Sequence, residues 1–474
     1  MTILRYIFIA FEVVLLFNLL IGVHELGHFL AAKWRGLKIE RFAIWFGKPV
    51  WKRKIDGVEY ALGWIPAGGY VALPQMATME AIEGKSENAD EPLPNVSALD
   101  KIIVAFAGPL FSFVLAFFFA FVVWGVGKPS NEVDNTTQIG WVDPSGPAAE
   151  AGLRPGDTIL EVDGHQVKNF LPTGSMADSV KWRIITSTGT NIAIKYVRDG
   201  KVAMAYPVPT NTPTKWYERK SLRQIFVDSA NRATIFQIAS NSPAAFAGLK
   251  TGDEVIALNG EKIYSSDSID YAQKAMSNGV VKPLVLTVQR GNEQFDCKLL
   301  AVRPQQPANL PPLIGIISWQ DDTNTLLVHP NPLEQIQSSV GQIVGTIQAL
   351  FAPKSGIGVQ QLGGAVMIIH VYSNLFQDKD GWRRVLWFSV ILNVNLALIN
   401  LLPLPVLDGG HILLSLIEVV RRRPVSMKIL QSIQTGFAAL LIGFMIYIAF
   451  FDTGDWLRSA RDNHEQPIIF APVK

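Results

Sequence analysis

Two histidines and one glutamate in the segment GVHELGH, residues 22–28, have the clearest potential for chemistry. On an α-helix, His24 and His28 project from one face, so both imidazoles can bind one metal ion. Glu25 can then act on a metal-bound water. The segment ends a long apolar run, where polar side chains are costly and are functional by default. Contacts between membrane helices are the alternative role for these residues.

A catalytic zinc ion usually has three protein ligands and one open position. The single cysteine, Cys297, excludes a Cys-rich metal site. The segment NVNLALINLLPLPVLDGGH, residues 393–411, ends the span at Pro403 and Pro405, which cannot continue a regular helix, and then presents Asp408. His411 is the rival ligand, but its position after two glycines suits a solvent-facing turn better. We therefore expect Asp408 to be the third ligand.

The composition indicates a membrane protein with a sizeable soluble part. Of the 474 residues, 49% are hydrophobic and only 17% are charged, and the mean hydropathy is +0.23. Four segments are apolar over about the 20 residues that a spanning helix needs, namely 4–32, 102–126, 385–402 and 429–451. The first is too long for a signal peptide and lacks a cleavage site, so we expect it to be retained. The other three exclude a secreted soluble metalloprotease.

Positive charge predicts the orientation of these spans. Two loops are rich in Lys and Arg and are expected to be cytoplasmic, although Arg383 and Arg384 argue mildly the other way. The basic residues are Lys33, Arg35, Lys38, Arg41, Lys48, Lys52, Arg53 and Lys54 after the first span, and Arg421, Arg422, Arg423 and Lys428 after the third. Both termini and residues 128–382 then lie outside.

Helix lengths predict that the three candidate ligands lie at one depth. The first and third spans both run from outside to inside in this topology. His24 lies 20 residues after Leu4, or about 30 Å along a helix, and Asp408 lies 23 residues after Val385, or about 34 Å. The ligands should therefore meet toward the cytoplasmic side.

The outer segment contains a repeat, because residues 141–167 match residues 237–263 at an offset of 96. The shared pattern is a short Ala-rich helix that ends at glycine, a Gly-Asp turn, a Val/Ile-rich strand and an Asn-Gly or Asp-Gly hairpin turn. It resembles PDZ domains of the bacterial, protease-associated kind. A generic β-rich repeat is the alternative. Such domains either bind a newly exposed peptide C-terminus or exclude substrates with bulky outer parts.

Two further segments have assignable structure. Residues 331–353 have apolar residues at helical spacing, which predicts a helix on the outer membrane surface or one packed on a PDZ-like domain. Residues 41–73 read as short strands with turns at 47–49 and 56–57. A β-structure at membrane depth is tolerated only where it is buried or lines a cavity, and an ordinary cytoplasmic hairpin is the alternative.

The combination of HELGH, NLLPLPVLDGG and the paired repeats resembles the site-2 protease family, which consists of intramembrane zinc metalloproteases. The resemblance covers nearly the whole chain and is closest to the members with two PDZ domains. It implies that His24, His28 and Asp408 bind one Zn²⁺ and that Glu25 is the catalytic glutamate.

The same resemblance implies a set of substrate-binding residues. Asn395 and Asn400 are expected to contact the substrate or help unwind it, with interhelical hydrogen bonding as the alternative. The motif PAGGYV resembles the family's re-entrant β-loop, whose edge, with Gly68, Gly69 and Tyr70, can pair with an extended substrate backbone.

Two positions depart from the family pattern. Ser112 stands where asparagine is usual after Gly-Pro, and Ala365 stands where proline is common. Neither is expected to touch the zinc ligands.

We therefore predict a polytopic α-helical membrane protein. It has four transmembrane helices, two inserted periplasmic PDZ-like α+β domains and a membrane-associated β-loop. The predicted boundaries are 1–127 for the first half of the membrane core, 128–220 and 221–305 for the PDZ-like domains, 306–382 for a linker with an amphipathic helix, and 383–474 for the second half and tail.

The resemblance also implies the activity and its setting. The protein should cleave transmembrane segments of single-pass proteins, such as anti-sigma factors and remnant signal peptides, after another protease has shortened their outer part. It should lie in the bacterial inner membrane, in contact with the lipid bilayer, and should have no nucleic-acid partner. The alternative is an inactive PDZ scaffold or membrane chaperone on the same fold, but such a protein has no need of Glu25.

Overall fold

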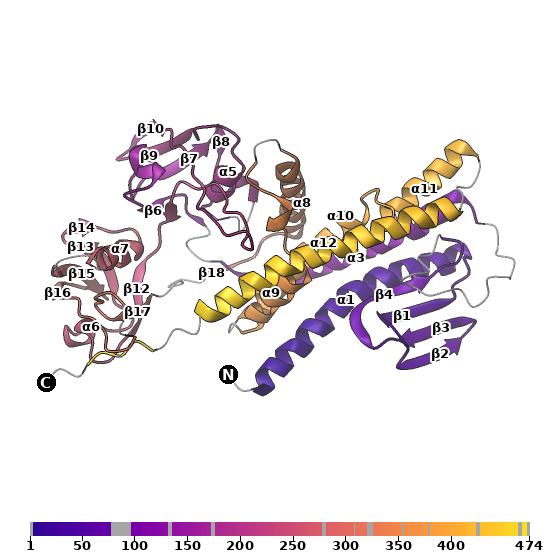
Figure 1. Ribbon diagram of the computed structural model, residues 1–474, viewed down its shortest axis with the longest axis horizontal. Coiled ribbons are helices and arrows are strands. Elements are labelled where there is room, and N and C mark those ends of the chain that lie inside the picture. The colour runs from indigo at the N-terminus through magenta and orange to yellow at the C-terminus, as the bar shows by residue number, and fades with distance from the viewer. Residues whose placement is uncertain are drawn as a thin grey trace. The chain divides into compact units, whose positions relative to one another are not determined.

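The protein is described from a computed structural model (Figure 1). It describes residues 3–76, 96–130, 135–171, 176–276, 281–307, 309–319, 326–352, 355–377, 380–422, 427–462 and 467–471. The chain divides into two compact units. The first comprises Met1–Lys128, Val328–Ile343 and Leu362–Thr453, and the second comprises Pro129–Leu327, Val344–Gln361 and Gly454–Lys474.

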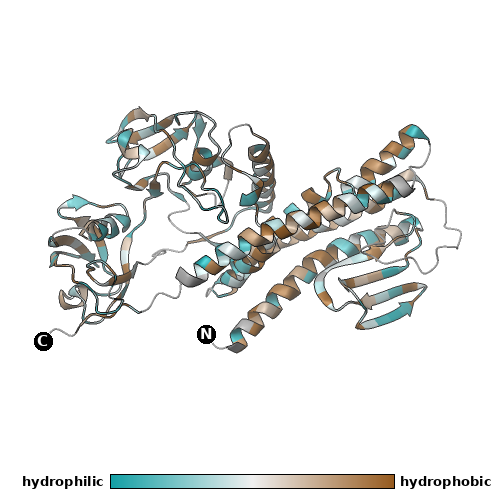
Figure 2. Ribbon diagram, in the orientation of Figure 1, coloured by the Kyte–Doolittle hydropathy of each residue, from teal (hydrophilic) through white to brown (hydrophobic). Residues whose placement is uncertain are grey.

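Within the described residues, four helices are long and apolar enough to cross a membrane, as predicted. They are α1 (Ile3–Arg35), α3 (Ala98–Val126), α10 (Gly381–Asn400) and α12 (Met427–Asp462). Figure 2 shows hydrophobic residues along all four. Small residues bring α1 and α3 together, because a Cβ added to Gly27 would lie only 2.4 Å from the carbonyl oxygen of Ala107.

Three shorter helices belong to the same membrane-protein architecture, and they differ from the sequence-based expectations. Two were not predicted, α9 (Ala365–Gln377) and α11 (Asp408–Arg421). The third, α8 (Pro332–Phe351), was predicted to lie on the membrane surface or on a PDZ-like domain. The helix itself is confirmed, and its second half from Val344 belongs to the same compact unit as the repeats. Its first half packs on the membrane helices, since Ile336 is buried among residues of α1, α3 and α10 and Gln335 Nε2 donates to the Ala120 carbonyl at 3.0 Å.

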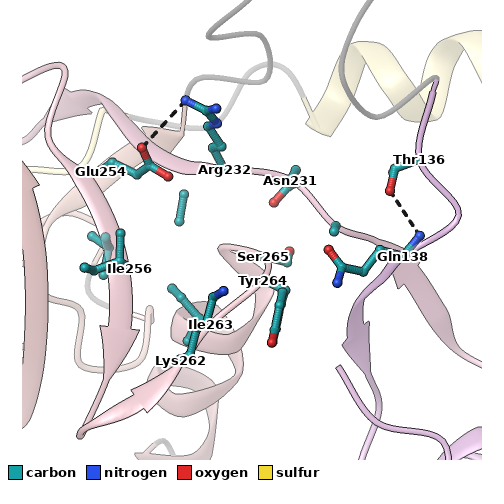
Figure 3. A pocket seen from close by; sticks show the side chains of 13 residues that line it. Thr136, Gln138, Asn231, Arg232, Glu254, Ile256, Lys262, Ile263, Tyr264 and Ser265 are labelled. Carbon is teal, nitrogen blue, oxygen red and sulfur yellow. Dashed lines mark hydrogen bonds and ion pairs between the residues drawn. The ribbon is translucent and has the colours of Figure 1, made fainter. Parts of the chain in front are cut away.

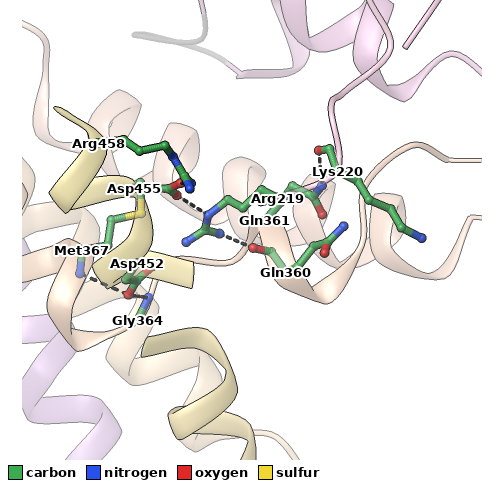
Figure 4. Close-up of polar contacts among 9 residues, drawn as sticks. All are labelled: Arg219, Lys220, Gln360, Gln361, Gly364, Met367, Asp452, Asp455 and Arg458. Atoms are coloured by element: carbon green, nitrogen blue, oxygen red, sulfur yellow. Dashed lines mark hydrogen bonds and ion pairs between the residues drawn. The ribbon is translucent and has the colours of Figure 1, made fainter. Parts of the chain in front are cut away.

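The N-terminus of α9 is fixed by a buried carboxylate on α12. Asp452 is 4% exposed, and its Oδ2 accepts hydrogen bonds from the backbone N–H groups of Gly364 at 2.9 Å and Met367 at 3.2 Å (Figure 4). These donors have no partner within α9, so the carboxylate acts as its N-terminal cap.

The segment after α1 forms a four-stranded sheet in the order β2-β3-β1-β4. The strands are β1 (Arg41–Phe46), β2 (Trp51–Ile55), β3 (Val58–Leu62) and β4 (Ile65–Ala72). Strands β1 and β3 are parallel and the other pairs are antiparallel. The turn predicted at 56–57 is confirmed, with Asp56 and Gly57 both at positive φ.

The first β-rich repeat has a four-stranded sheet in the order β10-β9-β7-β8 and a second sheet of β11 and β6. Its elements are β6 (Ile139–Val142), α4 (Pro147–Glu150), β7 (Thr158–Val162), β8 (His165–Gln166), η2 (Met176–Asp178), α5 (Val180–Thr186), β9 (Ile194–Arg198), β10 (Lys201–Ala205) and β11 (Val227–Ser229). Ile225 and Val227 are buried in the core of this repeat.

The second repeat has the strand order β16-β15-β13-β12-β17, with β14 paired to β13. Its elements are β12 (Ala233–Ile238), α6 (Pro243–Phe246), β13 (Glu254–Leu258), β14 (Glu261–Lys262), α7 (Asp267–Ala275), β15 (Leu284–Arg290), β16 (Glu293–Leu299) and β17 (Ile316–Trp319). The remaining elements are β5 (Lys128–Ser130), β18 (Leu326–Val328) and η4 (Val359–Gln361).

The cores of the repeats correct two predicted boundaries. The boundary between 220 and 221 is wrong, because Ile225 and Val227 belong to the first core; the repeats meet between Ser229 and Ala233. The end at 305 is also wrong, because Ile314 is buried in the second core and β17 pairs with β12. Each repeat ties its Gly-Asp turn to an arginine, Asp157 to Arg198 and Asp253 to Arg290.

A cavity of about 370 Å³ lies where the chain passes from the first repeat to the second (Figure 3). It is lined by Gln138, Asn231, Arg232, Glu254, Lys262 and Tyr264 among others.

Candidate active site

The structure brings the three predicted metal ligands together. His24 Nε2 lies 3.3 Å from His28 Nε2 and 3.2 Å from Asp408 Oδ2, and His28 Nε2 lies 3.3 Å from Asp408 Oδ1. Both histidines are buried, at 6% and 8% exposure. Among the described residues, these three form the one group of His, Cys, Asp and Glu side chains with suitable spacing for a metal ion.

This geometry fits zinc. Zinc–nitrogen and zinc–oxygen bonds of about 2.0–2.1 Å at tetrahedral angles place neighbouring ligand atoms about 3.3 Å apart, which agrees with all three separations. Asp408 Oδ2 is buried yet accepts no hydrogen bond from any described residue. A buried carboxylate oxygen without a hydrogen-bond partner is costly, and a bound cation removes that cost.

The other ring nitrogens are held by α3. His28 Nδ1 lies 2.8 Å from the carbonyl oxygen of Val104, which can only accept, so Nδ1 carries the proton and Nε2 presents its lone pair to the centre. His24 Nδ1 lies 3.0 Å from the hydroxyl of Ser112, a side chain with no exposed surface. The expectation that Ser112 touches no zinc ligand is therefore wrong. Its spacing after Gly-Pro was visible in the sequence, but which face of α3 meets α1 was not.

Replacing Ser112 with alanine is expected to weaken zinc binding by about 10–100-fold, because the residue that orients a metal-binding imidazole is lost. Competition with a zinc-binding dye measures the dissociation constant. Ser112→Asn, which retains a polar group and restores the residue usual in the family, should recover most of the affinity. Equal affinity of Ser112→Ala and the unchanged protein would contradict this role.

Gly108 allows the candidate ligand His28 to lie against α3. A Cβ at this position would lie 2.2 Å from His28 Nε2, the atom that faces His24 and Asp408. Gly108→Ala should therefore displace His28 and abolish stoichiometric zinc binding. Gly125→Ala is the matched control, since it lies in the same helix with no atom within 4 Å of the added Cβ. Metal analysis of the two purified variants checks the prediction, and a full zinc complement in Gly108→Ala would refute it.

Glu25 is half-buried beside the β4 strand. A Cβ on Gly69 would lie 3.6 Å from Glu25 Cγ, so the strand backbone passes next to the glutamate. Gly68 has φ +104, and a Cβ there would lie 2.6 Å from the Phe46 ring. Tyr70 stacks on Phe46 and its hydroxyl receives a hydrogen bond from Arg41 Nη1 at 3.2 Å. The predicted PAGGYV residues thus lie on a strand at the site.

The two asparagines of α10 differ in position. Asn400 Nδ2 lies 3.3 Å from His24 Nε2, at the edge of the metal group. The Asn395 side chain makes no hydrogen bond with any described residue. Five residues along the helix rotate it about 140° away from Asn400. The structure therefore brings Asn400, and not Asn395, to the zinc ligands.

His411 lies in the first turn of α11, so the expected solvent-facing turn is wrong. The glycines that precede it are inside the helix and allow close packing. A Cβ on Gly410 would lie 2.1 Å from the Leu404 carbonyl oxygen, and one on Gly409 would lie 2.3 Å from the Leu401 carbonyl oxygen. His411 is not part of the metal group.

Comparison with known proteins gives the family. The model of Peptidase family M50 matches residues 12–444. The chain belongs to this family. A "Regulator of sigma E protease" from Haemophilus influenzae is 30% identical over 449 residues, which cover 91% of this chain and 96% of the relative. "Protease RseP" from Yersinia pestis is 27% identical, over 92% of this chain and 96% of its own. A Vibrio cholerae protein named "Putative zinc metalloprotease" is 28% identical over 95% of this chain and 99% of the relative.

These relationships and the site geometry agree. The M50 chain is a zinc metalloprotease of a bacterial membrane, as the sequence predicted. Two of the candidate ligands lie on a membrane-spanning helix, and the third begins the helix after another such span. Its activity is therefore intramembrane proteolysis.

Proposed function

We propose that this M50 protease hydrolyses peptide bonds inside the transmembrane segments of single-pass membrane proteins, with His24, His28 and Asp408 as zinc ligands. The observation that carries the proposal is the position of Glu25. It follows the first ligand on a spanning helix and lies against β4, a strand with one unpaired edge. The base Glu25, the three candidate zinc ligands and a strand edge that can bind an extended chain therefore lie at the same place.

Bound zinc would polarise the scissile carbonyl and lower the pKa of its water to about 7. Glu25 takes the proton of the attacking water and delivers it to the leaving nitrogen. Asn400 Nδ2, next to His24, donates to the oxyanion that develops on the carbonyl. The α3 contacts to His24 and His28 keep both rings aimed at the centre throughout.

A helical substrate must unwind before its peptide bonds can be attacked. In the described part of the chain, β4 pairs only with β1, so its other edge offers free N–H and C=O groups. An extended substrate strand can pair with that edge and pass Glu25. Gly68 and Gly69 allow Phe46 and the Ala43 carbonyl to pack closely on β4, and Tyr70, fixed by Arg41, packs beside the bound chain.

The proposed substrates are anti-sigma factors and remnant signal peptides whose outer part another protease has shortened. The name of the Haemophilus influenzae relative, "Regulator of sigma E protease", supports the anti-sigma-factor part of this class. We place both β-rich repeats, as PDZ-like domains, and both termini in the periplasm of the inner membrane, with the zinc group toward the cytoplasmic side. In this arrangement the repeats screen substrates by the size of the outer part, and can bind a newly formed C-terminus.

Deleting residues 135–319 tests the screening role, because these limits remove both repeats together with their complete cores. Substrates that keep a folded outer domain should then be cleaved, whereas the intact protein leaves them uncut. The comparison is made in cells by immunoblot, with a pre-shortened substrate as the control. If the deletion cleaves the pre-shortened substrate and still spares the bulky one, the screening role is contradicted.

A further inference from the structure

The strand β2 forms the charged edge of the sheet that carries β4. All five of its residues, Trp51–Ile55, are exposed, and the central three are Lys52, Arg53 and Lys54. The strand order places β2 at the edge opposite β4 (Figure 1). Three spacings of about 4.8 Å separate the two edges by about 14 Å. One sheet therefore has a catalytic edge and a cationic edge.

This sheet lies beside the end of a membrane-spanning helix. The span of α1 ends at Arg35. Phe42 and Tyr60 of the sheet pack on Phe29, with ring centroids 5.3 and 6.0 Å apart. Phe29 precedes Arg35 by six residues, or about 9 Å along the helix. The sheet thus contacts α1 about 9 Å, measured along the helix, from the end of its span.

The exposed surface around β2 is both apolar and cationic. Its large apolar side chains are Val50 at 71% exposure, Trp51 at 53% and Ile55 at 43%, and Trp64, which follows the neighbouring strand β3, is 62% exposed. Three consecutive cations are costly in hydrocarbon, and exposed tryptophans are unfavourable in water. The headgroup layer suits both, since tryptophan rings gather there and Lys and Arg reach the phosphates.

The positive charge of this edge is only partly neutralised within the protein. Lys52 lies 3.4 Å from Glu59, which Arg41 also holds at 2.6 Å. Burial raises the pKa of Glu59, but Arg41 and Lys52 lower it by more. The pKa therefore lies below its usual value, and the carboxylate stays ionised. Among the residues that the structure describes, none forms an ion pair with Arg53 or Lys54. Lys54 lies opposite Glu59 in the register of β2 and β3 without an ion pair, so Arg53 and, in part, Lys54 remain for an external anion.

We propose that β2 binds the phosphate groups of anionic phospholipids through Arg53 and Lys54, with Trp51 and Trp64 in the headgroup layer. The hydrogen-bonded sheet connects this anchor to β4, so lipid binding fixes the depth at which β4 meets Glu25. The lipid site stands independently of the activity, whereas its effect on cleavage rests on the proposed function.

The test uses the full chain with Glu25→Gln, Cys297→Ala and Val50→Cys, labelled with a fluorophore at position 50. It is reconstituted in vesicles of phosphatidylcholine alone or mixed with phosphatidylglycerol, with a quencher on the lipid headgroups. Quenching should rise several-fold with phosphatidylglycerol. Lys52→Gln/Arg53→Gln/Lys54→Gln should remove that rise. Lys201→Gln/Lys250→Gln/Lys298→Gln, which changes the same charge at exposed lysines of the repeats, should keep it.

The active protein, with Glu25 present, gives the second measurement. Its cleavage rate for a single-pass substrate should be several-fold higher with phosphatidylglycerol, and the β2 triple variant should lose this dependence. Cleavage that is indifferent to lipid charge overturns the anchoring claim. Lipid-dependent quenching without cleavage in any vesicle supports the lipid site and contradicts the proposed function.

Two quenching results overturn the lipid site itself. One is equal quenching in both kinds of vesicle. The other is quenching that is the same in both kinds of vesicle but changes when the acidic residues of segment 77–95 are replaced by neutral ones. In that case the partner of β2 is segment 77–95. The acidic residues are Glu80, Glu83, Glu87, Asp90 and Glu91.

Discussion

Glu25→Gln is expected to retain a full complement of zinc and to lose cleavage of a transmembrane substrate by about 10²–10⁴-fold. Glutamine has nearly the same size, but its amide cannot take the proton of the attacking water, and a positioned acid–base group contributes about that factor. The metal group is unaffected, because His24, His28 and Asp408 remain. Initial rates with a purified single-pass substrate and metal analysis of the same preparation check both parts.

Glu12→Gln is the matched control for this substitution. Glu12 lies on the same helix, 13 residues before Glu25, which is about 20 Å away along the axis. The control makes the same chemical change inside the membrane and should leave the cleavage rate unchanged. If Glu25→Gln cleaves as fast as the unchanged protein, the chain acts as a scaffold or chaperone and the protease mechanism is wrong.

Asp408→Asn is expected to remove zinc and, with it, all cleavage. Asp408 supplies the only negative charge among the three ligands, and both of its oxygens face imidazole nitrogens at 3.2–3.3 Å. Losing an outer contact of a zinc ligand costs about 10–100-fold in affinity, so the loss of a ligand itself should exceed 100-fold. Zinc content after dialysis against a chelator of known affinity measures the effect.

His411→Asn separates the two candidate ligands of α11. His411 follows Asp408 by three residues and lies outside the metal group. Its replacement should leave the zinc content at one per chain. Zinc that survives Asp408→Asn and disappears in His411→Asn would assign the third ligand to His411 and contradict the arrangement described here.

The sequence was sufficient to predict the long-range pairing of ligands. Apolar runs identify the four spans, and counting residues along two of them places His24 and Asp408 at one depth, 384 residues apart. The structure then shows those side chains at 3.2 Å. The pairing was predicted correctly, but the count along one helix was wrong for Asp408, because α10 ends at Asn400 and the non-helical residues 401–407 lead to Asp408 at the start of α11.

Features that depend on packing were missed. Ser112 is polar and ordinary in the sequence, and only the rotation of α3 against α1 brings its hydroxyl to His24. The 13-residue helix α9 is too short to signal a span and is stabilised from outside by Asp452. The ends of both repeats were predicted too early. The sequence match between the repeats stops at residues 167 and 263, whereas Ile225 and Ile314, far beyond those points, are buried in the cores of the first and second repeat.

The most direct test of the central claim is the mass of the products made from a single-pass model substrate. The purified protein is incubated in vesicles with the substrate, and both fragments are analysed by mass spectrometry, with and without a zinc chelator. We predict one cut within the apolar segment, lost on chelation and restored by zinc. A cut outside that segment, or one that persists without metal, would contradict intramembrane zinc proteolysis.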